Sequence, residues 1–357
     1  MRFAHDGKER KQKMKMKKWM AMLVAGAMCA GMLAGCGSSS GSADQSGAQA
    51  SNKAFDGSIS FIISHKDEYL GTLDQAAKAS AESKGCTLTS TDCADDMNKQ
   101  IDYVRAAAEN KADAIIIVLA DDTRADEIVE AAGDTKVVFL NRIPQDESVL
   151  DENHVYVGSN EDDSGTYQGE MLADALKAEG KDSVNYLLFE GTAGLIHTTK
   201  RSEGMLKALD AAGITATAAA DPVDCGYDRT KAMDQMSVML AEGLDMSTID
   251  CIIANHDAMA LGVLESLRQN KVDTSHIKVV GVDGTNAGLQ AISDGSMLAT
   301  VYQNAVGQAT AGVQAAINLA SGADLTADIS YETDKDNENI IWVPFEKITA
   351  DNVEEYF

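Results

Sequence analysis

Short apolar runs alternate with segments of helical spacing along most of the chain. The runs ISFIIS (59–64) and AIIIVLA (114–120) are almost wholly apolar, which is typical of strands buried on both faces of a parallel sheet. The segment after the first run places apolar residues three or four positions apart from Leu70 to Ala81, and it stops at Gly85, a common helix C-cap. The pattern therefore predicts strands and helices in regular alternation.

This alternation continues to the C-terminus and predicts about ten strands, which form two sheets more readily than one. Strand–helix repeats with buried strands indicate parallel sheets and right-handed crossovers. Because the chain has only three prolines and no long linker between its halves, we expect several short crossings between the sheets. The predicted fold is α/β, with two doubly wound parallel-sheet lobes joined by a multi-crossing hinge. The predicted strands are 59–64, 87–91, 114–120, 137–141, 155–160, 184–191, one near 216–223, 251–256, 278–283 and 298–304.

The N-terminal segment has the layout of an export signal. A basic stretch, Lys11 to Lys18, precedes an apolar run from Trp19 to Leu33, which is shorter than the roughly 20 residues of a membrane span. The following LAGC, ending at Cys36, resembles the lipobox of bacterial lipoproteins, in which the cysteine is lipidated and becomes the mature N-terminus. The alternative is an ordinary signal peptide with an incidental Cys36. We expect translation to start at Met14 or Met16, which leaves a compact signal.

The segment after this signal, Gly37 to Ala50, is rich in Gly and Ser and predicts a flexible tether. Removal of residues 1–35 leaves 22 of the 30 basic and 54 of the 56 acidic side chains, a net charge of −32. Nucleic acid and anionic lipid surfaces bind basic protein surfaces, so this charge argues against both as partners. It favours a soluble body held beside a membrane.

The cysteines give no sign of a metal site or a disulfide framework. No CxxC pair and no Cys/His cluster with zinc spacing occurs. We predict free buried thiols in the mature domain, with a Cys225–Cys251 disulfide as the alternative. The six cysteines are Cys29, Cys36, Cys86, Cys93, Cys225 and Cys251.

Polar side chains recur just after the predicted strands, where ligands bind in open α/β sheets. Carboxylates, amides and guanidinium groups can together satisfy sugar hydroxyls, each of which donates and accepts, and aromatic rings can cover the C–H faces of a sugar. Asp and Asn at these turns also cap helices, so capping is the alternative role for any single residue. The residues are Asp67, Tyr69, Asn141, Arg142, Arg201, Asn255, His256, Asp257, Asp283 and Gln303.

Several segments together resemble the periplasmic sugar-binding proteins of the ribose and glucose/galactose type, and the glucose/galactose receptors most. The resemblance runs from about Ser58 to the end of the chain. It implies a type 1 periplasmic binding fold and the lipid-anchored receptor of a sugar ABC importer. The segments are GSISFIISHKDEYLGTL, VVFLNRIP, YVGSNEDDSGTYQGEMLA, CIIANHDAMALGVLESL, VVGVDG, ATVYQNAVGQA and IIWVPFEKITADNVEEY.

The resemblance also implies a role for each candidate residue. Tyr69 and Tyr227 would stack on the two faces of a pyranose, and Gln303 would offer an amide at a crossing strand. The others would bond hydroxyls from both lobes. The full predicted ligand-binding set is Asp67, Tyr69, Asn141, Arg142, His197, Arg201, Tyr227, Asn255, His256, Asp283 and Gln303.

The chain departs from the galactose receptors at three positions, two of which belong to this set. Leu195 and His197 stand where those receptors have a histidine and an aspartate, and His256 replaces an asparagine. These changes point toward a deoxy, modified or substituted sugar. The stretch ALKAEGKDSVNY lacks the D-x-D-x-D-G series of a calcium loop, so we expect no calcium site. We also expect no other metal and no cofactor.

The resemblance implies a monomer outside the cytoplasm, at the outer face of the cell membrane or in a periplasm, with an ABC permease and its ATPase as partners. A chemotaxis or sensor-kinase partner and a non-sugar ligand such as a nucleoside are alternatives. His197 and His256 could act as general acid and base, but no nucleophile elbow, zinc motif or Walker loop accompanies them. A repressor of the lac type is excluded because an export signal replaces its helix-turn-helix.

The expected division of the chain follows from the two-lobed fold. Residues 1–35 form the lipoprotein signal peptide and 36–56 the flexible tether. The N-terminal lobe is expected to comprise 57–160 and 303–338, and the C-terminal lobe 161–302 and 339–357.

Overall fold

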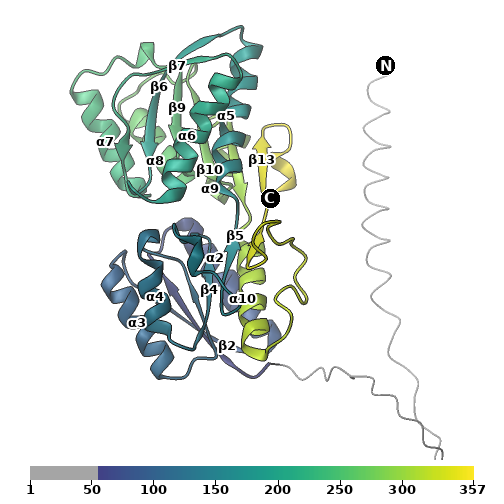
Figure 1. Ribbon diagram of the computed structural model, residues 1–357. Helices are drawn as coiled ribbons and strands as arrows, with labels where there is room; N and C mark the ends of the chain where they lie inside the picture. The colour runs from purple at the N-terminus through teal and green to yellow at the C-terminus, as the bar shows by residue number, and fades with distance from the viewer. Residues whose placement is uncertain (1–54) are drawn as a thin grey trace, which may run out of the picture. The chain divides into compact units, whose positions relative to one another are not determined.

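The computed structural model describes residues 55–357, which belong to one compact unit. Two β-sheets, each covered by helices on both faces, form this unit (Figure 1). The α/β class and the two parallel-dominated sheets predicted from the alternation are confirmed. The predicted signal peptide, the alternative start sites, the Gly/Ser tether and Cys36 lie outside the described residues.

The first sheet is wholly parallel, with the strand order β12-β5-β4-β3-β1-β2. Its inner strands β3 and β4 consist of buried aliphatic and aromatic residues, apart from Lys136 at the start of β4. This is expected for strands covered on both faces. We call this sheet and its helices the first lobe. Its strands are β1 (Ser58–Ile63), β2 (Thr87–Asp92), β3 (Ala114–Ile117), β4 (Lys136–Leu140), β5 (His154–Gly158) and β12 (Ile340–Trp342).

The second sheet has the order β13-β11-β10-β9-β6-β7, with the short β8 beside β6. All its pairs are parallel except β11 with β13. We call this sheet and its helices the second lobe. Its strands are β6 (Ser183–Glu190), β7 (Thr215–Ala218), β8 (Val223–Asp224), β9 (Cys251–Ala254), β10 (Lys278–Asp283), β11 (Ala299–Gln303) and β13 (Phe345–Thr349).

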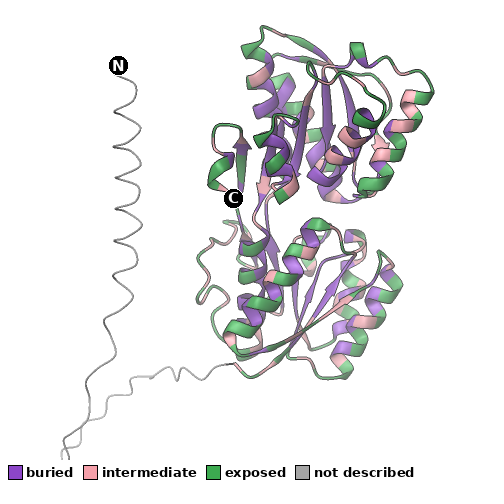
Figure 2. Ribbon diagram, turned by 180° about the vertical axis from the view of Figure 1, so that it is seen from behind, coloured by how far each residue is buried: buried purple, intermediate pink, exposed green. Residues whose placement is uncertain are grey.

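Helices cover both faces of each sheet (Figure 1). In the first lobe, α2 packs with α10 on one face and α3 with α4 on the other; in the second, α5 packs with α6 and α7 with α8. Figure 2 shows the resulting burial, with strands and inner helix faces buried and outer helix faces exposed. The helices are α2 (Glu68–Lys84), α3 (Met97–Glu109), α4 (Ala125–Ala132), α5 (Glu161–Ala178), α6 (Ile196–Ala211), α7 (Arg229–Ala241), α8 (Asp257–Gln269), α9 (Asn286–Ser293) and α10 (Ala305–Ser321).

Capping side chains explain where most helices begin. The Asp67 carboxylate accepts a hydrogen bond from Leu70 N at 2.7 Å, and Asn160 and Asp228 cap α5 and α7 in the same way. Gly85 ends α2 at a φ of 79°, the left-handed conformation that glycine adopts without strain. The three N-caps Asp67, Asn160 and Asp228 follow strands, so the same turns that start helices also bring polar side chains to the carboxyl edge of each sheet.

The chain passes between the sheets after β5, after β11 and after β12. The last passage differs from the expected boundary, because residues 339–357 were assigned together to the second lobe. Ile340–Trp342 instead pairs with β5 of the first sheet, and only Phe345–Thr349 joins the second sheet. The last crossing therefore follows Trp342, and Gln303 ends a strand of the second sheet.

Two local expectations also change. The strand predicted near 216–223 is two short strands, β7 and β8, and β3 ends at Ile117 rather than at residue 120. The four cysteines within the described residues are buried and free, so Cys225 and Cys251 form no disulfide. Among residues 55–357, no helix is both long enough and apolar enough to cross a membrane.

Candidate functional site

A small cavity of about 30 Å³ lies where the strand ends of both lobes meet. Ten of the eleven predicted ligand-binding residues line it, and Leu70 completes the lining. Small-molecule pockets usually measure roughly 300–1,000 Å³, so a sugar ring can enter this cavity only if the lobes separate or side chains move. The lining residues are Asp67, Tyr69, Leu70, Asn141, Arg142, His197, Arg201, Tyr227, His256, Asp283 and Gln303.

Asn255 is the one predicted residue that does not line the cavity. Its side-chain oxygen accepts a hydrogen bond from Gly191 N at 3.1 Å, and its amide donates to Ser202 Oγ at 3.2 Å. Its backbone oxygen accepts from Arg201 Nη1 at 2.8 Å. Asn255 therefore ties β9 to the segment after β6 and to α6, and it supports the cavity wall from behind.

Three lining residues have a backbone that side-chain-bearing residues rarely adopt. The φ angles are 68° at Asn141, 60° at Tyr227 and 115° at Asp283, all in the region that favours glycine. Such strain costs of order 1–3 kcal/mol per residue and concentrates at functional sites, where the backbone aims a side chain. Its occurrence at three strand-end residues of one cavity supports a functional role for this edge of the sheets.

The second-lobe wall contains a buried ion pair between Arg201 of α6 and Glu161 of α5. Nε and Nη2 of Arg201 donate to the two Glu161 oxygens, each at 2.8 Å, and both side chains are about 5% exposed. Burial opposes the charge of Arg201, but Glu161 more than offsets this and raises the pKa of Arg201 above its usual range. The bidentate pairing fixes the guanidinium plane. Arg201 is therefore a rigid part of the wall.

An aromatic cluster forms the adjoining part of this wall. The rings of His197 and Tyr227 stack with centroids 5.2 Å apart, and His256 meets Tyr227 edge-on at the same distance. The Tyr227 hydroxyl shares a hydrogen bond of 2.8 Å with Thr198 Oγ1. Tyr227, which was expected to stack on a sugar, thus stacks on the ring of His197 in this structure.

The hydrogen bonds of His256 determine its protonation. Nδ1 accepts from Met259 N at 3.1 Å, and Nε2 lies 2.8 Å from the Tyr227 carbonyl oxygen, to which it donates. His256 is therefore the neutral Nε2–H tautomer, and burial lowers its pKa to about 4. Both ring nitrogens are occupied, so His256 contributes its ring rather than hydrogen bonds to the cavity. Burial and the charges of Arg142 and Arg201 likewise hold the pKa of His197 well below its usual range.

The two carboxylates of the cavity differ in their surroundings. Burial raises the pKa of Asp283 well above its usual range, although Arg201 Nη1 lies 3.9 Å away and opposes the shift. Burial would also raise the pKa of Asp67, but His65 Nε2, 3.4 Å from Asp67 Oδ2, holds that pKa below its usual range. Asp67 is therefore a charged acceptor, whereas Asp283 is the group whose charge most needs a new partner.

Three buried polar atoms of the lining have no hydrogen-bond partner: the Tyr69 hydroxyl, His197 Nδ1 and Gln303 Nε2. Buried polar groups in proteins are nearly always paired, and an unpaired one costs about 1–3 kcal/mol. These atoms come from α2, α6 and β11, so they belong to both lobes. A ligand with several hydroxyl groups would satisfy all three.

Sequence reasoning missed the residues that support the lining. Glu161 follows the strand β5 directly, so its place after a strand end was a usable signal, but its pairing with Arg201 depends on helix packing. His65 also follows a strand, and its contact with Asp67 depends on Asp95 Oδ1, 3.0 Å from its other ring nitrogen. Burial opposes the charge of His65, but these carboxylates raise its pKa to about 9.

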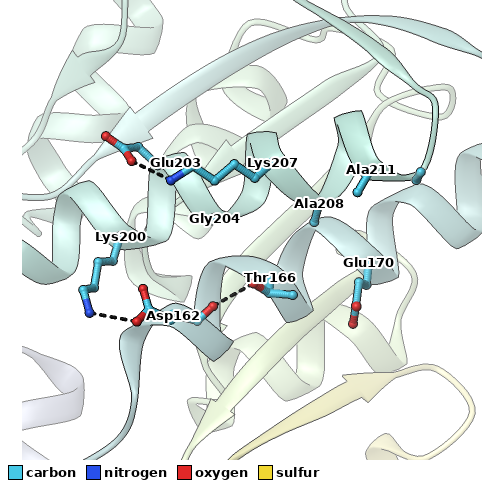
Figure 3. Close-up of a pocket in the computed structure, with 10 residues that line it drawn as sticks. Asp162, Thr166, Glu170, Lys200, Glu203, Gly204, Lys207, Ala208 and Ala211 are labelled. Atoms are coloured by element: carbon cyan, nitrogen blue, oxygen red, sulfur yellow. Dashed lines mark hydrogen bonds and ion pairs between the residues drawn. The ribbon is translucent and has the colours of Figure 1, made fainter.

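A much larger hollow of the described surface lies elsewhere, on the outer side of α5 and α6 (Figure 3). Its volume is about 620 Å³, but four of its five charged side chains pair with one another. Lys200 donates to Asp162 and Lys207 to Glu203, each at 2.9 Å. Exposed pairs of this kind are ordinary surface features. Size alone therefore does not identify the functional site.

Comparison with known proteins shows which protein family this chain matches. The model of the periplasmic binding protein domain matches residues 59–324. A provisionally named rhizopine-binding protein of Rhizobium meliloti is 27% identical over 310 residues, which cover 86% of this chain and 91% of that protein. The D-galactose/methyl-galactoside binding periplasmic protein of Haemophilus influenzae is 29% identical over 282 residues, 76% of this chain and 82% of that protein.

A solved structure shares both the fold and recognisable sequence identity. It is an ABC transporter solute-binding protein of Bacillus halodurans with bound myo-inositol, and it is 27% identical to this chain with a TM-score of 0.72. The match covers 86% of this chain and 99% of that one.

Proposed function

Because the chain belongs to the periplasmic binding protein family, we propose that it captures a monosaccharide of the galactose or glucose type and delivers it to an ABC permease. Relatives of the chain include binding proteins for D-galactose and ribose, and a similar solved structure is an ABC transporter solute-binding protein with bound myo-inositol. The chain is accordingly an extracytoplasmic binding protein rather than an enzyme, and the resemblance drawn from its motifs is confirmed at the family level.

The observation that carries this proposal is the convergence of strand-end residues on one cavity with three unpaired polar atoms. Asp67 and Asp283 supply acceptors, Arg142 supplies donors, and Tyr69 supplies a ring with a free hydroxyl. Sugar hydroxyls both donate and accept, so they match this mixed set better than an apolar ligand would. Arg201 pairs with Glu161, and Asp67 pairs with His65. The remaining arginine and aspartate of the lining, Arg142 and Asp283, have charges of opposite sign, which favours a neutral ligand.

The proposed mechanism is closure of the two lobes around the sugar. A cavity of about 30 Å³ is too small for a pyranose, so the sugar must enter an open form. Contacts to both lobes then favour the closed form, since a ligand stabilises the state that it binds more tightly. The three passages of the chain between the sheets serve as the hinge, and the permease recognises the closed form.

A thermal-shift screen of the chain from residue 51 onward tests the ligand class. A saturating ligand stabilises the protein by about 2.7 kcal/mol at 100 times its dissociation constant. We expect a clear shift with galactose, glucose, a methyl galactoside or a deoxy hexose. A shift only with ribose, allose or myo-inositol would support the receptor function but contradict the proposed galactose or glucose type of ligand. A shift only with a nucleoside would overturn the sugar proposal.

Substitution of Asp283 tests the site itself. We expect Asp283→Ala to abolish binding of the ligand found in the screen, because the ligand loses its most strongly buried acceptor. The protein should remain folded, since removal of a buried carboxylate with one distant partner relieves a cost. Asp294→Ala, an exposed carboxylate of the same lobe, is the control. An unchanged affinity in Asp283→Ala would remove this residue from the site.

The lipid anchor at Cys36 and the identity of the partner form the remaining part of the proposal. We expect the full chain to fractionate with membranes and Cys36→Ser to be released into the soluble fraction. Equal release of both would contradict the anchor. Co-purification with a permease and its ATPase would support transport, whereas co-purification with a sensor kinase or chemotaxis receptor would favour the signalling alternative. Sedimentation should report a monomer.

A further inference from the structure

One hydrogen bond joins the two lobes away from the cavity lining. Asp122, in the turn after β3 of the first lobe, accepts through Oδ2 from Ile196 N of α6 in the second lobe, at 2.7 Å. Asp122 is 1% exposed, and its Oδ1 has no hydrogen-bond partner. The side chain of a buried carboxylate thus finds its hydrogen bond across the lobe boundary and not within its own lobe.

The helix that donates this hydrogen bond, α6, has no side-chain cap of its own. Leu195 occupies the N-cap position of α6, and its side chain cannot accept a hydrogen bond. The first turn of α6 contains no acidic residue. The neighbouring helices α5 and α7 are capped by the residues directly before them, Asn160 and Asp228. An N-terminal carboxylate satisfies a free N–H group and complements the helix dipole. For α6, this carboxylate comes from the other lobe.

The same residue of α6 also makes an apolar contact across the boundary. The Ile196 side chain packs against the hydrophobic core on the α3–α4 face of the first sheet. Ile196 therefore contacts the first lobe twice, through its backbone N–H and through its side chain. Neither exists once the lobes separate.

We propose that Asp122 and Ile196 form a clasp that stabilises the closed form and positions the N-terminal end of α6. This end carries His197 and Arg201, which line the cavity. Asp122 is then a positioning residue that controls ligand affinity without lining the cavity. The effect on affinity rests on the proposed sugar-binding function, whereas the effect on closure does not.

The test compares Asp122→Ala with Asp122→Asn and the wild type, using the chain from residue 51 onward. Asn keeps an acceptor oxygen, so we expect it to retain most of the clasp, whereas Ala removes it. Loss of an N-cap weakens a helix start enough to change an equilibrium about fivefold to tenfold. We expect Asp122→Ala to bind the sugar from the screen about five to ten times more weakly, through faster dissociation.

Small-angle X-ray scattering of the ligand-free protein gives a second readout that needs no sugar. We expect a larger radius of gyration for Asp122→Ala than for the wild type and for Asp122→Asn. The matched control is Asp146→Ala, which removes an exposed carboxylate that bonds Ser148 N within the first lobe. It should change neither readout.

The outcomes separate this proposal from the proposed function. If no sugar binds to the wild type, the scattering result alone decides the clasp. An unchanged radius in Asp122→Ala, with unchanged dissociation where a ligand is known, would overturn the clasp. Should Asp122→Ala fail to fold, Ile196→Ala is the second variant, because it removes the apolar half of the clasp and leaves the backbone bond.

Discussion

Two buried arginines line the cavity, one from each lobe, and the protein holds them in different ways. Arg201 of the second lobe donates to both oxygens of Glu161 and to the backbone oxygen of Asn255. Arg142 of the first lobe donates to the Leu119 backbone oxygen at 2.8 Å and otherwise lies over the Tyr227 ring, 6.0 Å from its centroid. The second-lobe arginine is thus part of the lobe's own structure, whereas the first-lobe arginine keeps donors available for a ligand.

The first prediction removes the buried partner of the second-lobe arginine. Glu161→Ala leaves the buried Arg201 without its bidentate partner, and removal of one member of a buried ion pair costs about 3–5 kcal/mol. We expect a loss of this size in the free energy of unfolding, measured with urea. Glu170→Ala on the same helix removes an exposed partner of Lys347 and should cost about 0–1 kcal/mol. Similar losses in both variants would contradict the structural role of Arg201.

The second prediction addresses the first-lobe arginine. Arg142→Gln should leave the free energy of unfolding nearly unchanged, because it removes one backbone hydrogen bond together with a buried charge. Affinity for the sugar should fall about tenfold to a hundredfold, since a hydrogen bond from a charged group contributes about 1.5–3 kcal/mol. Calorimetric titration measures this loss. If Arg142→Gln lost stability but kept its sugar affinity, Arg142 would have a structural role and not a ligand-binding one, contrary to this prediction.

The fold was predictable because each element carries its own periodicity. Buried parallel strands are continuous apolar runs, and amphipathic helices between them have a period near 3.6. The hinge strand β12 has only three residues, too few to show a period, so its membership in the first sheet depended on pairing with β5. The lobe boundary near the C-terminus was therefore misplaced.

The site was predictable only as far as the carboxyl-edge rule reaches. That rule brings Asp67, Asn141 and Asp283 to one cavity from strands far apart in the sequence. It does not give the direction of a side chain, so Asn255 was expected in the lining although it bonds Gly191 and Ser202 behind it. The partner of Arg201 was missed for the same reason.

The third prediction concerns the pH dependence of the second-lobe wall. The folded protein holds the pKa of His256 at about 4, against about 6.5 in an unfolded chain, because the ring is buried with both nitrogens bonded. Between these values the unfolded state binds more protons, so stability falls as pH falls from 6.5 toward 4. The slope from this group is about 1.4 kcal/mol per pH unit.

The variant His256→Asn isolates this slope from other titrating groups. Asparagine can still cap α8 but does not titrate. Urea unfolding at a series of pH values from 7 to 4 should therefore show a shallower decline for the variant than for the wild type. Parallel declines would mean that His256 is protonated in the folded protein, and the assigned tautomer would then be wrong.

The smallest predicted effect comes from one substitution made in both lobes. Tyr69→Phe in the first lobe removes a buried hydroxyl without a partner, so the free energy of unfolding should stay equal or rise slightly. Tyr227→Phe in the second lobe breaks the hydrogen bond with Thr198 and should cost about 1 kcal/mol. For sugar affinity, the larger loss should come from Tyr69→Phe, because only its hydroxyl is free to meet a ligand. Stability losses of equal size in the two variants would contradict a general difference between the two cavity walls. The difference between Arg142 and Arg201 would then depend only on the pairing of Arg201 with Glu161.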